Sequence, residues 1–379
     1  MSHSIIPPSS AHIWRYCSGW VKLSQEIPQQ ETEHILRGSA IHEVGAAIIR
    51  SGIRGGLGSI PVIGDRATNG TIIEEDMVEC AQLWANTFLR EYQARITKGG
   101  IRVGIEKPVG CPKIHAESYG TPDSWLYDPN QRLLIVDDCK GGHVHVDAYE
   151  NWQLINYANG ILSHLGVEDP DTQVWLRIVQ PFSYHSDGSV RVWKTTLGAL
   201  LSYWEDLRIA ARDALDGYPG LNTSHQCRRC HVRHACPAAL EAGLGLYEVA
   251  MAPVAQHLPP SALGLQMQIV DRAMEQLKAL MTGYEEQVKA TIKSGTPVPG
   301  WCLQPTSGRE KWAKKTEEVS AMGSLFGIEL KKDALITPNQ ARKAGLPDDI
   351  LKVYCGRETG LELKPESTNK TRMIFEGGR

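Results

Sequence analysis

The strongest constraint on the fold is an apolar, β-branched run that ends in charge, LLIVDDCKGG at residues 133–142. A run of this kind, entered through a turn sequence with Pro and Asn, predicts a strand over 132–139. Because side chains alternate along a strand, Asp138 and Lys140 share one face and Asp137 faces the other. The end of the strand therefore presents a carboxylate and an ammonium group together.

The surrounding pattern predicts an α/β fold. One stretch alternates apolar and polar residues, and two apolar runs joined by a turn follow it. Together these three stretches predict a three-stranded β-meander. Amphipathic stretches predict helices on either side of the meander, and a later apolar run predicts an interior strand. The predicted strands span 101–106, 118–127, 132–139 and 172–181, and the predicted helices span 38–50, 71–97, 146–165 and 197–215. Together these elements predict a mixed central sheet flanked by helices.

The meander also predicts a cation site. A hairpin brings Asp123, in the sequence Gly-Thr-Pro-Asp, next to Asp138, and two carboxylates repel each other unless a cation lies between them. Mg²⁺ and Mn²⁺ suit such a site, and Lys140 adds a positive group near an attacking water or a developing charge. Phosphodiester hydrolysis needs both, so we expect a metal-dependent nuclease centre. A solvated Asp-x-Lys pair is the alternative.

Two helical segments supply further polar residues. Gln153 and Tyr157 are four positions apart on the helix after the meander, and hence on one face of it. His42 borders the apolar stripe of the helix at 38–50. Taken alone, each of these residues is more often structural than functional.

Three cysteines, Cys227, Cys230 and Cys236, lie in a short polar segment. Thiolates at this spacing fit zinc or an iron–sulfur cluster, and residue chemistry leaves both open. The candidates for a fourth zinc ligand are His225, His231 and His234. Cys17 is isolated in the sequence, and on its own it is interpreted as a buried thiol.

The composition gives expectations for the binding partners and the cellular compartment of the protein. A net charge of −3 gives no global basic field, although one groove can still concentrate Lys and Arg. No apolar run approaches the ~18 residues of a membrane span, and the first residues lack a signal-peptide pattern. We therefore expect no membrane association and a cytoplasmic protein whose nine cysteines stay reduced.

The composition changes after the cysteine segment. Prolines at 251–260 predict a linker, and the next residues predict a long amphipathic helix over 261–293. We predict a core domain over 1–250 and a mainly helical accessory region over 251–379, which ends in a small α/β or irregular segment. Basic and aromatic residues in that segment could hold DNA by charge and stacking, with a solvated face as the alternative. They are Arg309, Lys311, Trp312, Lys314 and Lys315.

Four short motifs occur in an order that resembles the RecB-type nucleases of the PD-(D/E)xK superfamily, which share a restriction-endonuclease-like core. The motifs are Gly38-x-x-x-His42, Gly120-x-x-Asp123, Asp138-x-Lys140 and Gln153-x-x-x-Tyr157. The resemblance covers about residues 10–240 and not the remaining third of the chain.

The resemblance implies a role for each motif residue. The metal ligands would be His42, Asp123, Asp138 and the backbone carbonyl of Cys139, with Glu106 at an acidic position that some members use. The catalytic residues would be Asp123, Asp138, Lys140, Gln153 and Tyr157. Lys140 would orient or activate water, and the last two would support Lys140 or the DNA. Asp137 could replace Asp138 only if the strand register slipped, which would move Lys140 off the shared face.

The cysteines resemble a subset of these nucleases that includes the AddB nuclease domain and CRISPR adaptation nucleases. In that subset one upstream cysteine and a late Cys-x2-Cys-x5-Cys motif hold a [4Fe–4S] cluster. The resemblance therefore implies a cluster bound by Cys17, Cys227, Cys230 and Cys236, with zinc as the alternative. Such a cluster would act as a staple between the ends of the core and would take no redox part in catalysis.

The resemblance implies a DNA exonuclease that acts in recombination, replication or repair. The arrangement of the last third is similar to that of phage and prophage proteins, which implies a host-cell cytoplasm and a single-strand annealing or other recombination protein as a partner. Two alternatives remain: a structure- or site-specific endonuclease of the same superfamily, and a non-catalytic, metal-stapled DNA-binding protein.

Overall fold

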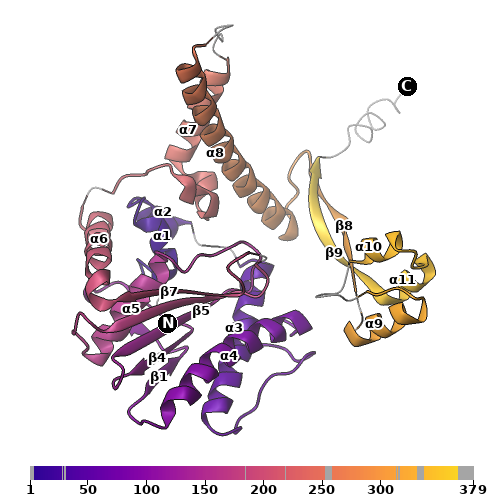
Figure 1. Ribbon diagram of the computed structural model, residues 1–379. Helices are drawn as coiled ribbons and strands as arrows, with labels where there is room; N and C mark the ends of the chain where they lie inside the picture. The colour runs from indigo at the N-terminus through magenta and orange to yellow at the C-terminus, as the bar shows by residue number, and fades with distance from the viewer. Residues whose placement is uncertain are drawn as a thin grey trace. The chain divides into compact units, whose positions relative to one another are not determined.

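The computed structural model describes residues 4–27, 29, 31–183, 185–217, 219–251, 258–312, 314, 316–330 and 337–365 (Figure 1). The chain divides into two compact units, Met1–Leu280 and Met281–Arg379, which are treated separately below. The predicted boundary lay at residue 250, whereas by internal contacts the first part of the long helix groups with the first unit. No helix among the described residues is long and apolar enough to cross a bilayer.

The first unit is built on a five-stranded mixed sheet in the order β1-β4-β5-β6-β7. Its strands are β1 (Arg102–Ile105), β4 (Ser124–Asp128), β5 (Leu133–Cys139), β6 (Gln173–Val179) and β7 (Val190–Thr196). The β5–β6 pair is parallel and the other three pairs are antiparallel. The predicted mixed sheet with flanking helices is thus confirmed.

The predicted strand over 118–127 was wrong in one respect that bears on function. The segment splits into β3 (Tyr119–Gly120), which pairs with β2 (Val109–Gly110), and β4, which begins at Ser124. Pro122 has no N–H to donate to a ladder, so it interrupts the pairing. Asp123 consequently lies just before β4 and not in the middle of a strand.

Helices cover both faces of the sheet (Figure 1). They are α1 (Ala11–Trp14), α2 (Trp20–Glu26), α3 (Glu33–Ile53), α4 (Glu75–Ile96), α5 (Trp152–Leu165) and α6 (Leu197–Leu215). One apolar core joins α1, α5 and α6 to the sheet, and a second joins α3 and α4 to its other face. Leu134 and Val136 belong to the first core, whereas Cys139 belongs to the second, so β5 is buried on both faces.

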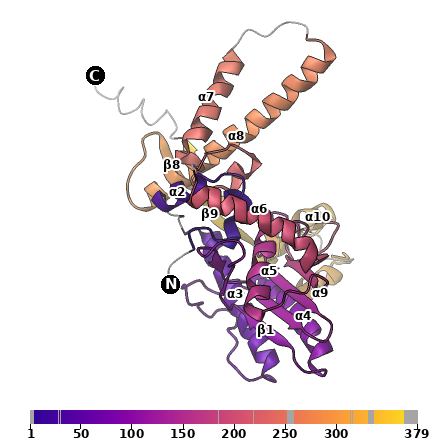
Figure 2. The same ribbon diagram turned by 90° about the vertical axis from the view of Figure 1, so that its left-hand side faces the viewer.

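Helix α3 and helix α4 run side by side, which both views show (Figure 1 and Figure 2). A side chain at Gly45 would place its Cβ 2.3 Å from Cε3 of Trp84, so the glycine allows the two helices their close approach. The indole of Trp84 is fully buried, and its Nε1 donates a hydrogen bond to Oγ of Ser124 at 2.9 Å. This packing fixes the α3 turn that carries His42.

Helix α5 begins later than the predicted residue 146. The side chain of Asn151 caps it by accepting a hydrogen bond from the N–H of Leu154, and Gly166 ends it with a φ of +68°. Residues 140–151 are therefore a loop that leads from the end of β5 to the first turn of α5, where Gln153 lies.

The remaining elements of the first unit lie before and after the sheet in the sequence. They are the 3-10 helices η1 (Pro8–Ser10), η2 (His225–Arg229) and η3 (Arg233–Ala235), helix α7 (Pro237–Met251) and the start of helix α8 (Pro260–Lys293). The residue pattern had predicted α8 but not α7.

In its described residues, the second unit contains the end of α8, a two-stranded antiparallel sheet and three short helices. After α8 come β8 (Trp301–Trp312), α9 (Thr316–Leu325), α10 (Pro338–Lys343), α11 (Asp348–Tyr354) and β9 (Cys355–Pro365). Its core includes Val319, Met322, Leu330 and Leu351. The long β8–β9 pair was not predicted, because neither strand shows regular alternation of apolar and polar residues.

Candidate functional site

The ends of β4 and β5 bring two acidic residues together. The antiparallel register pairs Ser124 with Asp137, which places Asp123 beside the end of β5. The backbone N–H of Cys139 donates a hydrogen bond to Oδ2 of Asp123 at 2.5 Å. Asp123 and Asp138 are both buried. Sheet pairing thus brings the two predicted carboxylates to one end of the sheet, although they are 15 residues apart in the sequence.

A histidine and a third carboxylate complete one group of ligand atoms. Nδ1 of His42 lies 3.1 Å from Oε1 of Glu106 and 3.3 Å from Oδ1 of Asp123. Among the described residues, this trio is one of two groups of three or more metal-type ligands whose atoms lie within 4.8 Å of one another. The trio lines an open cleft together with Gly38, Ser39 and Thr121.

The backbone of Glu106 adopts a strained conformation beside this cleft. Its φ is +48°, a left-handed value that a non-glycine residue adopts at a cost. Its N–H donates a hydrogen bond to the carbonyl oxygen of Asp123 at 2.9 Å, which holds the conformation. Strand β1 therefore ends at Ile105, and the carboxylate of Glu106 lies next to His42.

The cleft favours positive charge. Burial alone would lower the pKa of His42, but the charge of Asp123 and hydrogen bonds to Asp123 and Glu106 outweigh burial and raise the pKa well above its usual value. The carboxylates of Asp123 and Glu106, which favour the protonated form of the imidazole, would also favour a metal cation in place of that proton.

Lys140 is held between a carboxylate and an amide. Its Nζ lies 2.8 Å from Oδ2 of Asp138 and donates a hydrogen bond to Oε1 of Gln153 at 3.1 Å. Burial would lower the pKa of Lys140, but the charges of Asp138 and Asp123 raise it, so the side chain stays an ammonium. The predicted Asp-x-Lys pair and the predicted glutamine are therefore in direct contact.

The pKa of Asp138 is raised to about 6. Burial is the largest cause, the charge of Lys140 opposes it, and the charge of Asp123 adds to it. Within the described part of the chain, Oδ2 of Asp138 has no well-aligned hydrogen-bond donor, although Lys140 lies close. This carboxylate thus has Lys140 as a charged partner and one oxygen without an aligned donor.

Tyr157 lies one turn beyond Gln153 and is buried. Burial and the charges of Asp123 and Asp138 raise its pKa, while a hydrogen bond with Gln153 lowers it. A Cβ at Gly120 would lie 3.2 Å from Cε1 of Tyr157, so the motif glycine lets the β3 backbone approach this ring. Tyr157 therefore supports Gln153 from behind, and the described contacts do not bring it to the cleft.

The opposite face of β5 carries a buried network that the sequence did not reveal. Asp137 accepts two hydrogen bonds from Arg177 and one from Ser124, and Arg177 also contacts Glu91 at 3.2 Å. Since Arg177 is 40 positions from Asp137 and lies on the parallel partner strand β6, no local signal joins the two.

Four cysteines line one small, mostly apolar cavity in the first unit. They are Cys17, Cys227, Cys230 and Cys236, and the cavity is completed by side chains such as Ile13, Trp20 and Ala239. Backbone N–H groups of Asn222 and Ser224 donate to the sulfurs of Cys17 and Cys227 at 3.5 and 3.3 Å. Residues more than 200 positions apart thus meet at one place.

Among the described residues, no three of these four thiol sulfurs lie within 4.8 Å of one another. Burial raises the pKa of Cys230 to about 12, and the other three cysteines add to the rise. His231, one candidate for a fourth zinc ligand, instead has Nε2 3.1 Å from the carbonyl oxygen of Ile27.

The predicted DNA-binding residues belong to the second unit. Arg309 and Lys311 lie on β8, Trp312 is half-buried against the core of that unit, and Lys314 is exposed. Lys315 lies outside the described residues. Their role stays a prediction.

The chain belongs to a family described as protein of unknown function, DUF2800, which it matches over residues 3–350. A comparison with curated proteins finds no match. The family match spans the sheet, the cysteine cavity and most of the second unit.

Proposed function

We propose that the protein is a divalent-metal-dependent DNA nuclease of the RecB-like, PD-(D/E)xK type. The observation that carries the proposal is the meeting of His42, Asp123, Asp138 and Lys140 at the ends of β4 and β5. These residues come from three separated motifs, and two of their contacts are hydrogen bonds or ion pairs of 3.3 Å or less.

The donor set fits Mg²⁺ or Mn²⁺. Asp123 and Glu106 offer hard carboxylate oxygens, His42 offers one imidazole nitrogen, and Oδ2 of Asp138 is a buried oxygen without an aligned donor. The carbonyl of Cys139 follows Asp138 directly at the end of β5. When bound, the ion would hold the scissile phosphate and lower the pKa of an attacking water.

The protein's own residues have separate tasks. Lys140, kept charged by Asp138, would orient that water or stabilise negative charge that develops on the phosphate. Gln153 would fix the position of the ammonium group through its 3.1 Å hydrogen bond. Tyr157 is a positioning residue because it acts through Gln153.

The cysteine cavity supports a [4Fe–4S] cluster as part of this proposal. A tetrahedral zinc site with Zn–S bonds of about 2.3 Å requires sulfurs about 3.8 Å apart, whereas among the described residues no three of the thiol sulfurs lie within 4.8 Å of one another. We favour a cluster, because its thiolate ligands would be farther apart than those of a single zinc ion. It would tie α1 to the segment before α7, with Cys17, Cys227, Cys230 and Cys236 as ligands.

We favour an exonuclease that acts in DNA recombination, replication or repair. This preference rests on the resemblance to the iron–sulfur RecB-like subset, and an annealing protein would be a fitting partner. A site- or structure-specific endonuclease and a non-catalytic DNA-binding protein are the competing outcomes of the test.

The test is digestion of linear DNA labelled at either the 5′ or the 3′ end, beside covalently closed circles, with Mg²⁺ or Mn²⁺ and with chelator. We expect metal-dependent loss of linear DNA and intact circles, and we expect Asp138→Asn to abolish digestion but retain DNA binding. Cleavage of closed circles would favour the endonuclease. DNA binding without cleavage under any divalent ion would refute the nuclease.

A further inference from the structure

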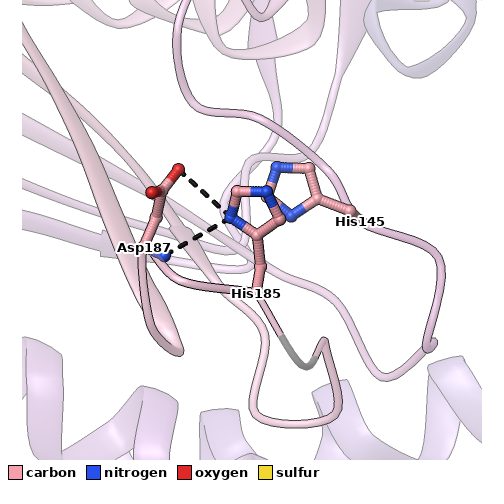
Figure 3. A group of neighbouring side chains, drawn as sticks. All are labelled: His145, His185 and Asp187. Carbon is pink, nitrogen blue, oxygen red and sulfur yellow. Dashed lines mark hydrogen bonds and ion pairs between the residues drawn. The ribbon is translucent and has the colours of Figure 1, made fainter.

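A second group of metal-type ligands lies apart from the proposed nuclease centre. His145 belongs to the loop after β5, and His185 and Asp187 belong to the loop between β6 and β7 (Figure 3). One ligand atom from each of the three residues lies within 4.8 Å of the others. The two imidazole rings stack with centroids 4.0 Å apart, and Nδ1 of His185 is 3.3 Å from Oδ2 of Asp187.

Buried polar side chains fix the loop that carries His145. Nε2 of Gln180 donates hydrogen bonds to the carbonyl oxygens of Gly142 and Val144 at 2.7 and 2.8 Å. Nε of Arg191 donates another to the carbonyl oxygen of Val146 at 2.9 Å. Because Gln180 and Arg191 are themselves buried, the backbone on either side of His145 is held in place.

A tight turn presents the other two ligands. The N–H of Gly188 donates to the carbonyl oxygen of His185 at 3.1 Å, and Gly188 has a φ of +77° that suits glycine. The N–H of Asp187 lies 3.4 Å from Nδ1 of His185. The turn thus sets the imidazole and the carboxylate side by side, next to the ring of His145.

We propose that His145, His185 and Asp187 form a binding site for a divalent transition-metal ion of the zinc class. Two imidazoles and one carboxylate are donors that Zn²⁺, Co²⁺ and Ni²⁺ prefer, whereas Mg²⁺ favours sites in which most ligands are oxygens. Nδ1 of His145 lies 3.3 Å from Oγ of Ser183, and an outer contact of this kind orients metal-binding histidines. Three protein ligands leave one position for water.

Small side-chain rotations complete the geometry. Donor atoms around a tetrahedral ion with bonds of about 2.1 Å are about 3.4 Å apart, so atoms within 4.8 Å must close by about 1.4 Å at most. The side chains of His185 and Asp187 are 42% and 56% exposed and are free to turn. Since nitrogen lone pairs lie in the ring planes, the two stacked rings would tilt toward each other so that a nitrogen of each faces the same ion.

The site would join two loops that also meet through hydrogen bonds and the ring contact of His143 with Phe182. One is the loop 140–151, which runs from the end of β5 to the cap of α5, and the other is the β6–β7 turn. An ion that binds only the folded chain stabilises it by mass action. This inference is independent of the proposed nuclease activity, since it requires neither DNA nor Mg²⁺.

The test uses the full chain with Zn²⁺ as the probe, and the bound metal is counted by equilibrium dialysis and elemental analysis. The variants are His145→Ala, His185→Ala and Asp187→Asn. The matched control is His143→Ala, which removes an exposed histidine of the same loop whose Nδ1 contacts the carbonyl oxygen of Phe182 at 3.1 Å. Circular dichroism checks that every variant is folded.

We expect the wild type and His143→Ala to bind one equivalent of Zn²⁺ more than His145→Ala and His185→Ala. Because every variant keeps the four cysteines, any zinc bound in the cysteine cavity cancels when the bound zinc is compared between variants. With Co²⁺ in place of zinc, the same two variants should lose visible d–d bands but no sulfur-to-cobalt charge-transfer band. An unchanged count in both histidine variants, or an equal loss in His143→Ala, would overturn the proposal.

Discussion

Arg177 binds Asp137 with two hydrogen bonds, from Nε to Oδ1 at 2.6 Å and from the second guanidinium nitrogen to Oδ2 at 3.0 Å. The next residue, Asp138, points to the other face of β5 and contacts Lys140. Two adjacent aspartates therefore have different partners. The structure pairs Asp137 with a structural arginine and Asp138 with the motif lysine.

This division predicts opposite effects of Asp137→Asn and Asp138→Asn. Asp137→Asn leaves the buried guanidinium of Arg177 with Glu91 as its remaining charged contact, and breaking a buried ion pair costs roughly 3 kcal/mol or more. Asp138→Asn removes a carboxylate that burial destabilises, so the free energy of unfolding should not fall. Urea unfolding of both variants in chelator measures the difference.

DNA cleavage should also distinguish Asp137→Asn from Asp138→Asn. Asp138→Asn should abolish metal-dependent DNA cleavage, while Asp137→Asn should retain it at temperatures where the variant is folded. A stable Asp137→Asn together with an unfolded Asp138→Asn would reverse the assignment of the two faces.

Patterns within the strands predicted most of the sheet, because alternation and apolar runs are local. The same alternation separated Asp137 from Asp138. It missed the break at Pro122, although the missing N–H of proline is a local signal. It could not predict that Glu106 adopts a positive φ, because that conformation is held by the hydrogen bond to Asp123 on a neighbouring segment. Arg177 and the His145 group were missed for a related reason: their partners lie on other strands or loops.

The close approach of α3 and α4 predicts contrasting effects at two glycines. Gly45→Ala would put a methyl group against the buried indole of Trp84, whose hydrogen bond to Ser124 keeps it from moving. Overpacking of this kind costs about 1–3 kcal/mol. Gly38→Ala meets no atom within 4 Å and should stabilise the helix by about 0.5–1 kcal/mol.

Thermal unfolding of the two glycine variants beside the wild type measures this contrast. The melting temperature should fall for Gly45→Ala and rise slightly for Gly38→Ala. Equal melting temperatures would mean that the two helices separate to admit the methyl group.

The four cysteines predict a brown, iron-containing protein when it is purified without oxygen. Cys17→Ser should lose iron and the visible absorbance, and its free energy of unfolding should fall by roughly 5 kcal/mol in the chain-entropy model, because the staple closes a loop of about 210 residues. Cys302→Ser, in the second unit, is the matched control and should retain both. A colourless protein with stoichiometric zinc would contradict the cluster.

His12, on α1, predicts a pH dependence of stability. Burial is the main cause that lowers its pKa to about 4, and the charges of Arg229 and Lys140 add to the effect. The unfolded chain, with an ordinary histidine pKa near 6.5, therefore binds a proton that the folded chain does not bind between about pH 6.5 and 4. The contribution of His12 to the free energy of unfolding is fully present above that pH window and is lost as the pH falls through it.

The slope of stability against pH isolates this group. Below pH 6.5 one such proton contributes up to about 1.4 kcal/mol per pH unit, so His12→Gln should have a flatter slope than the wild type by up to that amount. Urea unfolding at pH 5, 6 and 7.5 measures both slopes, and the comparison within each protein cancels any constant effect of the substitution. Parallel slopes for the two proteins would show that His12 is protonated in the folded state at pH 5.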